Sequence, residues 1–386
     1  MQSTSQTNDE NAMASKLVRP RAYKPFGDRG GLKHGDRVTT FGNITKPQQS
    51  FKRPALGNIT NKSTVTSNKK AILENIKVER REEVIRRSSV GSPKKHISPA
   101  TPGLNADDEF DIDREDKGNE RSCWQYAAEI HKYYFAAEKL RLASPNYMLD
   151  QVDINTKMRS ILIDWLVDVH YKYSLLEQTL HIAVSLIDRH LEKNLTLPRA
   201  RLQLVGITAL FIAAKYEEIY PPEAKDFVKI TDNAYTLQEL FQMEEELLRS
   251  IGYRVTVPTS YQFMNRFLKA TKTKDQKIQL YANYLVDRSL QEYKLLRYPP
   301  SMIAASGVYL ARALMEQHPI WSPTAEYHST YSTAAMRPCV KEMHEMIVTA
   351  NANVAKSSRL TAVTRKFAKD KFLGVSKIPL RSNVNM

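Results

Sequence analysis

Two segments of this chain, residues 158–173 and 202–216, are apolar on almost every side when they are drawn as helices. A surface helix carries one apolar stripe opposite a polar face, so a helix that is apolar all round has to be buried among other elements. Small residues at Gly206, Ala209 and Ala213 also let neighbouring backbones approach the second segment closely. The two segments therefore require a helical domain large enough to enclose both.

Apolar residues at helical spacing continue on both sides of these segments. Tyr126, Ile130 and Tyr134 indicate a preceding helix, and Asp153 and Asn155 are candidates to cap the next one. Further helices of this first set are expected at residues 176–191 and 237–251. A second set is expected at residues 260–270, 276–293, 300–315, 324–331 and 334–351.

The central helix of the second set, residues 303–311, is rich in small residues, as residues 202–216 are in the first set. This likeness predicts a divergent five-helix repeat. Because no run shows the alternation typical of strands, we predict an all-α fold of two tandem five-helix units preceded by an N-terminal helix.

Composition separates the rest of the chain from these helices. Residues 1–106 hold 20 Lys and Arg against 8 Asp and Glu, a net charge of +12, with few apolar residues. Such a segment buries too little apolar surface to offset the entropy of ordering it, so we predict a long disordered N-terminal tail. Residues 107–120 are acidic and are interpreted as a solvated linker. We place the first unit with its preceding helix at 121–256, the second at 257–355 and a flexible basic tail at 356–386.

Several function classes lack their sequence signals. The two cysteines, Cys123 and Cys339, are too few for a disulfide framework or a four-ligand zinc site. The chain contains no GxxxxGK[ST], HExxH or GxSxG motif. The first ten residues are polar, and the longest apolar stretch, residues 202–214, is too short to span a bilayer. We expect a soluble intracellular protein with no catalytic residues, no cofactor, no metal and no membrane contact.

Three stretches resemble the cyclin box: residues 158–170 (MRSILIDWLVDVH), residues 202–222 and residues 230–235 (ITDNAY). The resemblance runs from about residue 126 to 371 and is to mitotic B-type cyclins; residues 289–293 (SLQEY) lean toward the third B subtype. Ser160 and Asp168 depart from the usual alanine and glutamate. The resemblance implies two stacked five-helix cyclin boxes in a regulatory subunit, itself not an enzyme, that activates a mitotic cyclin-dependent protein kinase at the G2/M transition.

Lys215 and Glu244 are the first candidate site. From the residues alone, a lysine near a helix C-terminus and a glutamate among three acids are ordinary surface charges. The resemblance implies instead that the two grip the mobile regulatory helix of the kinase. Their apolar surroundings would be Ile130, Ile212, Tyr216, Leu248 and Tyr253.

One face of the helix at 158–173 is the second candidate site. Met158, Ile161, Leu162 and Trp165 fall at i, i+3, i+4 and i+7, a spacing that from the residues alone favours core. The resemblance implies that this face is a shallow exposed patch that docks Arg-x-Leu segments of substrates and inhibitors. The patch would be completed by Asp168, Leu202 and Gln203. Ile163, Leu166 and Val167 would then form the core.

Arg159 and Asp188 lie among apolar residues on neighbouring helices. We predict a buried ion pair that fixes how the helices pack. Removing one partner would leave an uncompensated buried charge, at a cost of about 3–5 kcal/mol.

The N-terminal tail carries short regulatory motifs. Arg53, Leu56, Ile59 and Asn61 fit the destruction box R-x-x-L-x-x-I-x-N, which implies recognition by the anaphase-promoting ubiquitin ligase. Ser92, Ser98 and Thr101 precede prolines and are expected phosphorylation sites of proline-directed kinases. A small kinase-associated adaptor is a further expected partner. The basic clusters are compatible with nuclear import, and we expect the protein in nucleus and cytoplasm.

Two other classes of function stay open on the residues alone. A transcription-type cyclin or general transcription factor of the same fold would use the basic tails to contact nucleic acid. That class predicts a zinc ribbon or a basic helical face, but the chain has no Cys-x-x-Cys motif, and it leaves the destruction box without a role. An enzyme is the third class and has no motif to support it. We expect no direct nucleic-acid partner.

Replacing both Arg53 and Leu56 by alanine is expected to leave kinase activation intact and the protein present after anaphase begins, because both anchors of the motif are lost. Immunoblots of synchronised cells measure this. Arg86→Ala with Ile97→Ala, which removes one basic and one apolar residue elsewhere in the tail, is the matched control. If the Arg53/Leu56 variant disappears on the normal schedule, the motif is not the main degradation signal.

Overall fold

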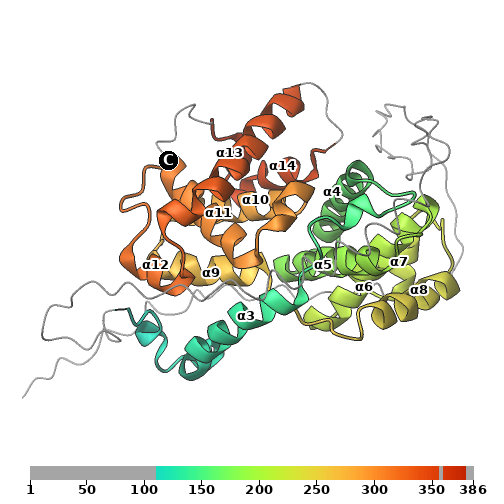
Figure 1. Cartoon of the computed structure of the whole chain (residues 1–386), viewed down its shortest axis with the longest axis horizontal. Coiled ribbons are helices and arrows are strands. Elements are labelled where there is room, and N and C mark those ends of the chain that lie inside the picture. The colour runs from blue at the N-terminus through green and yellow to red at the C-terminus, as the bar shows by residue number, and fades with distance from the viewer. Residues whose placement is uncertain (1–109, 356–359, 380–386) are drawn as a thin grey trace, which may run out of the picture. The chain divides into compact units, whose positions relative to one another are not determined.

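The computed structural model of the chain describes residues 110–355 and 360–379 (Figure 1). Over these residues the regular structure consists of 12 α-helices and short 3-10 turns, with no strand. This confirms the predicted all-α class. The predicted disordered tail, residues 1–106, lies outside the described residues.

The first set of five helices is arranged around α6 (Leu202–Glu217), which is buried from Leu202 to Ala214. The helices α4 (Thr156–Lys172), α5 (Glu177–Lys193), α7 (Ala224–Lys229) and α8 (Leu237–Ser250) all pack against it. A Cβ atom at Gly206 would lie 2.6 Å from Cδ1 of the buried Leu162. Glycine at this position is therefore what lets α4 and α6 pack this closely.

The short helix α7 was not predicted. Its six residues are too few to show a helical period, and they follow closely on the double proline at residues 221 and 222. The backbone N–H of Glu223 donates to Oδ2 of Asp226 at 3.3 Å, which closes the first turn of α7 locally.

The second set repeats the arrangement around α11 (Pro300–Leu314). The helices that contact it are α9 (Ser260–Ala270), α10 (Gln276–Ser289), α12 (Pro323–Ser329) and α13 (Thr333–Ala355). Here too a glycine lies at a close approach, since a Cβ at Gly307 would be 2.9 Å from Cγ2 of Val286. The helix predicted at 276–293 ends earlier, at Ser289, because residues 293–297 turn into a 3-10 helix.

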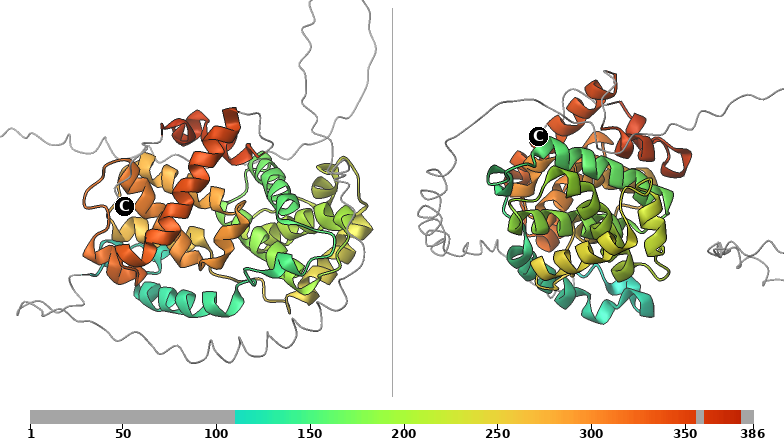
Figure 2. Two further views of the ribbon diagram at one scale, coloured as in Figure 1. Left: turned by 45° about the horizontal axis from the view of Figure 1, so that its top comes forward. Right: turned by 90° about the vertical axis from the view of Figure 1, so that its right-hand side faces the viewer.

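The first described helix, α3 (Ala127–Arg141), precedes both sets and lies on their outside (Figure 2). The carboxylate of Glu138 accepts from the backbone N–H of Ser301 at 3.0 Å and from its hydroxyl at 2.7 Å. A carboxylate is stabilised at this place because it meets the positive end of α11. Arg141 donates to the carbonyl of Thr256 at 2.5 Å, in the connection between the two sets. These bonds fix α3 against the helix sets.

The interpretation of residues 107–120 as a solvated linker is wrong for residues 110–116. The ring of Phe110 stacks on that of Tyr327 at 4.7 Å. Asp113 accepts from Arg266 at 2.5 Å and from Lys269 at 2.6 Å, both on α9. The acidic run is not free in solvent because a basic pair of the second helix set neutralises it.

The prediction of a flexible basic tail after residue 356 is wrong for residues 360–379. Helix α14 (Ala362–Phe367) packs on α4 and α10, and Val363 and Phe367 are completely buried. Phe372 and Val375 are buried farther along. These apolar residues lie in turns too short to show a helical period, so the basic composition dominated the prediction. Residues 356–359 and 380–386 lie outside the described residues.

The imidazole of His170, near the end of α4, is buried and neutral. Its Nε2 donates to the carbonyl of Leu176 at 2.9 Å, and its Nδ1 is enclosed without a hydrogen-bond partner. Burial, reinforced by the positive charge of Lys366, lowers the pKa of His170 from 6.5 to about 4. As the pH falls, the unfolded chain therefore takes up a proton at this residue at a higher pH than the folded chain does.

Between pH 6.5 and 4 the free energy of unfolding is expected to fall with decreasing pH, because the unfolded state binds the extra proton. One such group contributes at most about 1.4 kcal/mol per pH unit. His170→Gln is expected to reduce the loss between pH 6.5 and 4.5 by on the order of 1–2 kcal/mol. Urea unfolding at several pH values measures the slope independently of any change in absolute stability. An unchanged slope in the variant would contradict the assignment.

Candidate functional site

Lys215 and Glu244 form an ion pair on the surface of the first helix set. Lys215 lies in the last turn of α6, where a cation complements the helix dipole, and Glu244 lies in the middle of α8. The side chain of Lys215 is 42% exposed and that of Glu244 is 15% exposed. The Nζ atom of Lys215 also lies 4.1 Å from the centre of the Phe211 ring. The structure thus brings the first predicted pair together at an accessible place.

The predicted apolar surroundings of this pair differ in exposure. Tyr216 and Tyr253 are exposed, whereas Ile130 and Leu248 are partly buried. Ile212 is buried, so in this structure it lies beneath the accessible surface around the pair. The reason is that neighbouring helices enclose α6 throughout its first thirteen residues.

Other exposed apolar side chains near this pair were missed from the sequence. Ile219 and Tyr220, just after α6, are 86% and 89% exposed. Phe241 of α8 is also exposed, and its ring lies 6.4 Å from that of Phe211, the ring beneath Lys215. Large apolar side chains gathered on a soluble surface usually mark a binding site. A signal was present in residues 219 and 220, which are apolar but stand directly before a helix-ending double proline.

The predicted docking face of α4 is only partly accessible. Ile161 and Trp165 are partly buried, as a docking patch requires, but Leu162 is completely buried and Met158 is nearly so. Leu202 and Gln203 at the start of α6 are buried as well. The exposed patch that the resemblance implied is therefore wrong for these four side chains, whereas the core position that spacing alone favoured is right for Met158 and Leu162. The physical reason is that α4 packs so closely on α6 that Leu162 fills the space above Gly206. Ile163, Leu166 and Val167 are core, as predicted.

Asp168, the predicted acceptor for a docked arginine, already holds an arginine of the same chain. One Nη2 atom of Arg365 donates to both carboxylate oxygens of Asp168, at 2.8 and 2.6 Å. Both side chains are about half exposed, so the pair is accessible to solvent. Nearby, the carboxylate of Asp164 accepts from the backbone N–H of Ala362 at 2.8 Å. The sequence did not predict this contact because residues 356–386 were interpreted as a flexible tail.

Arg159 and Asp188 form the buried ion pair that the sequence predicted. Two guanidinium nitrogens of Arg159 donate to the two oxygens of Asp188, at 2.6 and 2.8 Å. The hydroxyl of Tyr147 donates to Asp188 at 2.7 Å. Arg159 also donates to the carbonyl of Leu290 at 2.9 Å, so the pair connects the first helix set to the second.

A second buried charge cluster lies between the two sets and was missed. Lys366 of α14 donates to Glu177 at 2.5 Å and to Asp287 at 2.7 Å, and His181 lies 3.2 Å from Asp287. Burial acts to raise the pKa of Asp287, but the ammonium of Lys366 and the bond from His181 outweigh it and hold that pKa well below its ordinary value. The cluster joins α5, α10 and α14. Spacing could not predict it, because Asp287 and Lys366 lie far along the chain from Glu177 and His181.

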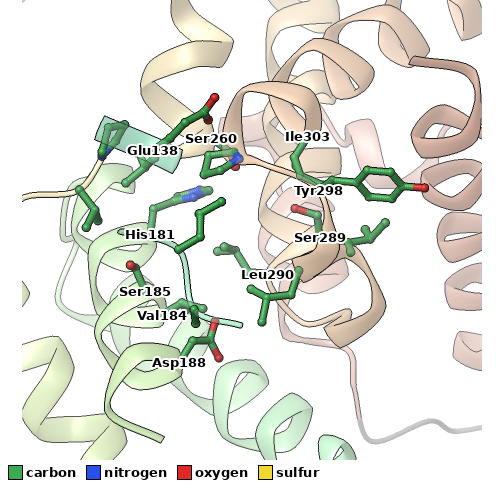
Figure 3. Close-up of a pocket in the computed structure, with 18 of the residues that line it drawn as sticks. Glu138, His181, Val184, Ser185, Asp188, Ser260, Ser289, Leu290, Tyr298 and Ile303 are labelled. Carbon is green, nitrogen blue, oxygen red and sulfur yellow. The ribbon is translucent and has the colours of Figure 1, made fainter. Parts of the chain in front are cut away.

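Close to the Arg159 pair, a cavity of about 110 Å³ lies between the two sets (Figure 3). Its walls carry Glu138, His181 and Asp188, together with apolar residues such as Val184 and Leu290. In the described part of the chain no group of three or more His, Cys, Asp or Glu side chains is placed to hold a metal ion. Within that same part, no helix is both long enough and apolar enough to cross a membrane.

Comparison with known proteins identifies both helix sets. The profile of the cyclin N-terminal domain matches residues 129–256, and that of the cyclin C-terminal domain matches residues 258–381. A viral cyclin from herpesvirus saimiri superposes with a TM-score of 0.52 at 18% identity, over 56% of this chain and 96% of that one. At this identity the superposition shows the fold alone.

Similar sequences come from plants. The chain is 41% identical over 263 residues to Cyclin-B2-1 of Oryza sativa subsp. japonica, which covers 68% of this chain and 61% of the relative. It is 40% identical over 268 residues to G2/mitotic-specific cyclin-2 of Medicago sativa, which covers 69% of this chain and 80% of the relative. The match therefore spans about three fifths of the rice relative. The assignment to the third B subtype, which residues 289–293 favoured, stays a prediction.

Proposed function

The chain belongs to the cyclin family, and on this premise we propose that it is the regulatory subunit that binds and activates a cyclin-dependent protein kinase in G2 and mitosis. The observation that carries the proposal is the Lys215–Glu244 pair set among exposed apolar side chains. The similarity of the chain to relatives named B2-type and G2/mitotic-specific cyclins supports the proposal that it acts in G2 and mitosis.

The geometry of this surface suits the capture of a helix. Lys215 supplies ammonium donors and Glu244 supplies carboxylate acceptors. Together they can bond the free N–H groups at the start of a partner helix and the C=O groups of the segment that leads into it. Tyr216, Phe241 and Ile219 offer apolar area around the charges. A charged centre surrounded by apolar side chains that exclude water is typical of an interface hot spot. Binding in this way would hold a mobile kinase helix in its active position.

Alanine at both Lys215 and Glu244 is expected to abolish kinase activation and to weaken kinase binding by about 2 kcal/mol or more. Thermal unfolding of the free subunit is expected to change little, because exposed ion pairs contribute about 0.2–1 kcal/mol to stability. Kinase assays and isothermal titration calorimetry on the purified complex measure both effects.

The matched control is Lys225→Ala with Glu223→Ala, which removes another exposed Lys–Glu pair of the first helix set. The control is expected to activate the kinase normally. Normal activation by the Lys215/Glu244 variant would remove this pair from the proposed interface.

We further propose that the accessible part of the α4 face, Ile161, Trp165 and Asp168, docks Arg-x-Leu segments of substrates and inhibitors. A docked arginine would have to displace Arg365 from Asp168. Exposed pairs of this kind are worth about 0.2–1 kcal/mol, so the competition is expected to lower docking affinity by up to about fivefold.

Arg365→Ala is therefore expected to raise the affinity of an Arg-x-Leu peptide about two- to fivefold, because Arg365 no longer competes for Asp168. Asp168→Asn is expected to lower that affinity. Fluorescence anisotropy with a labelled peptide measures both, and Arg199→Ala, which breaks another exposed pair with Asp153, is the control. If neither variant changes the affinity, Asp168 does not bind the docked arginine.

The remaining assignments stay proposals. The destruction box at Arg53, Leu56, Ile59 and Asn61 and the sites Ser92, Ser98 and Thr101 lie outside the described residues. We propose degradation through the anaphase-promoting ubiquitin ligase, association with a small kinase-associated adaptor, and residence in both nucleus and cytoplasm. The Arg53/Leu56 variant tests the first, co-purification with the kinase tests the second, and imaging of a fluorescent fusion tests the third.

A further inference from the structure

Near the end of α3, the charges of two arginine side chains, Arg141 and Arg254, act on the side chain of a third, Arg189. Arg141 ends that helix, Arg189 lies on α5, and Arg254 lies in the connection between α8 and α9. The guanidinium of Arg141 donates to the carbonyl of Thr256 at 2.5 Å, so it lies against the connection that carries Arg254. The Nη1 atom of Arg189 is enclosed and has no hydrogen-bond partner.

The charge around Arg189 is poorly balanced. Burial lowers the pKa of the Arg189 guanidinium, and repulsion from Arg141 and then from Arg254 lowers it further. The carboxylate of Glu192 acts to raise the pKa of Arg189, but one of its oxygens already accepts from the backbone N–H of Ser144 at 3.2 Å. The carboxylate that favours the charged form of Arg189 is therefore partly engaged elsewhere.

Such an arrangement is costly unless something else offsets it. A buried donor without an acceptor loses its bonds to water and gains nothing in return, and neighbouring like charges repel. Local conflicts of this kind are expected where a site awaits a ligand. The missing component is an anion with several acceptor oxygens.

We propose that Arg141, Arg189 and Arg254 form a binding site for a phosphorylated side chain of the partner kinase. A phosphate suits the site better than a carboxylate, because it brings about two negative charges and three acceptor oxygens to several guanidinium groups. The proposal rests on the proposed kinase-binding function.

The position of the site connects it to the kinase. Thr256, whose carbonyl receives the bond from Arg141, uses its hydroxyl to bond the hydroxyl of Tyr216. Tyr216 directly follows Lys215 and belongs to the surface proposed to hold the kinase helix. The arginine cluster is therefore continuous with that surface, and a bound kinase would lie within reach of it.

The test compares the phosphorylated and the phosphatase-treated kinase. The unaltered chain is expected to bind the phosphorylated kinase more tightly by about tenfold, and Arg189→Gln with Arg254→Gln is expected to abolish this preference while affinity for the dephosphorylated kinase stays the same. Arg249→Gln, which removes another exposed arginine of the first set, is the matched control and keeps the preference. Calorimetric titration measures all six affinities.

A second measurement uses the free subunit. At constant ionic strength, inorganic phosphate is expected to raise the melting temperature of the unaltered chain more than that of the double variant. Without phosphate the double variant is expected to melt no lower than the unaltered chain, because the substitutions remove a repulsion. A structural role for Arg189 would instead lower the melting temperature.

The outcomes separate this proposal from the one it rests on. Equal affinity of the unaltered chain for both kinase forms, or a double variant that keeps the preference or weakens both forms alike, overturns the phosphate site and leaves the kinase-binding function standing. Failure of the unaltered chain to bind either kinase form overturns the proposed function, and the phosphate-dependent melting then decides whether an anion site exists.

Discussion

The arrangement of the described residues depends on two buried salt bridges of Lys366. Its ammonium group is enclosed between Asp287 of one helix set and Glu177 of the other. A charge taken out of water is tolerated only when its partners are placed correctly, and removing one partner of such a pair costs about 3–5 kcal/mol. Apolar surfaces would let two helix sets slide over one another. The buried charges of Lys366, Asp287 and His181 instead favour one alignment of α5, α10 and α14.

A second set of directional bonds reinforces the same seam. Arg159 bonds Asp188 within the first set and the carbonyl of Leu290 in the second, and the hydroxyl of Ser160 donates to the carbonyl of Gln291 at 2.8 Å. The helix α3 then depends on this alignment, because Glu138 holds it to α11 of the second set while Arg141 holds it to the connection from the first. The seam thereby sets where α3 lies relative to Tyr216, whose hydroxyl bonds Thr256 in that connection.

Segments at both ends of the described chain contribute to the fold by charge pairing. The acidic residues 113 and 116 bind Arg266 and Lys269, and Arg365 binds Asp168. In each case a segment with the composition of a solvated tail forms ion pairs with oppositely charged residues of a helix. A few of its apolar side chains, such as Phe110 or Phe367, also pack against the fold. One of these contacts occupies the carboxylate proposed to dock partners, so packing of the chain end and access to α4 are linked.

The sequence by itself determined the helical class, the repeat of two helix sets and the two central helices, because an apolar helix with small residues at 206 or 307 has to be enclosed wherever it lies. It missed α7, which completes the first set, because that helix is too short to show a period. The sequence also predicted two pairs: Arg159 with Asp188 from their apolar context, and Lys215 with Glu244 from the family resemblance. Only the tertiary structure decided between the core position that spacing favoured for Met158 and Leu162 and the exposed patch that the resemblance implied. A helix that is apolar on both faces does not show whether neighbours cover both. The Lys366 cluster and the three interacting arginines were likewise beyond the sequence, because each joins residues that are distant in the chain and lie near one another only after the helices pack.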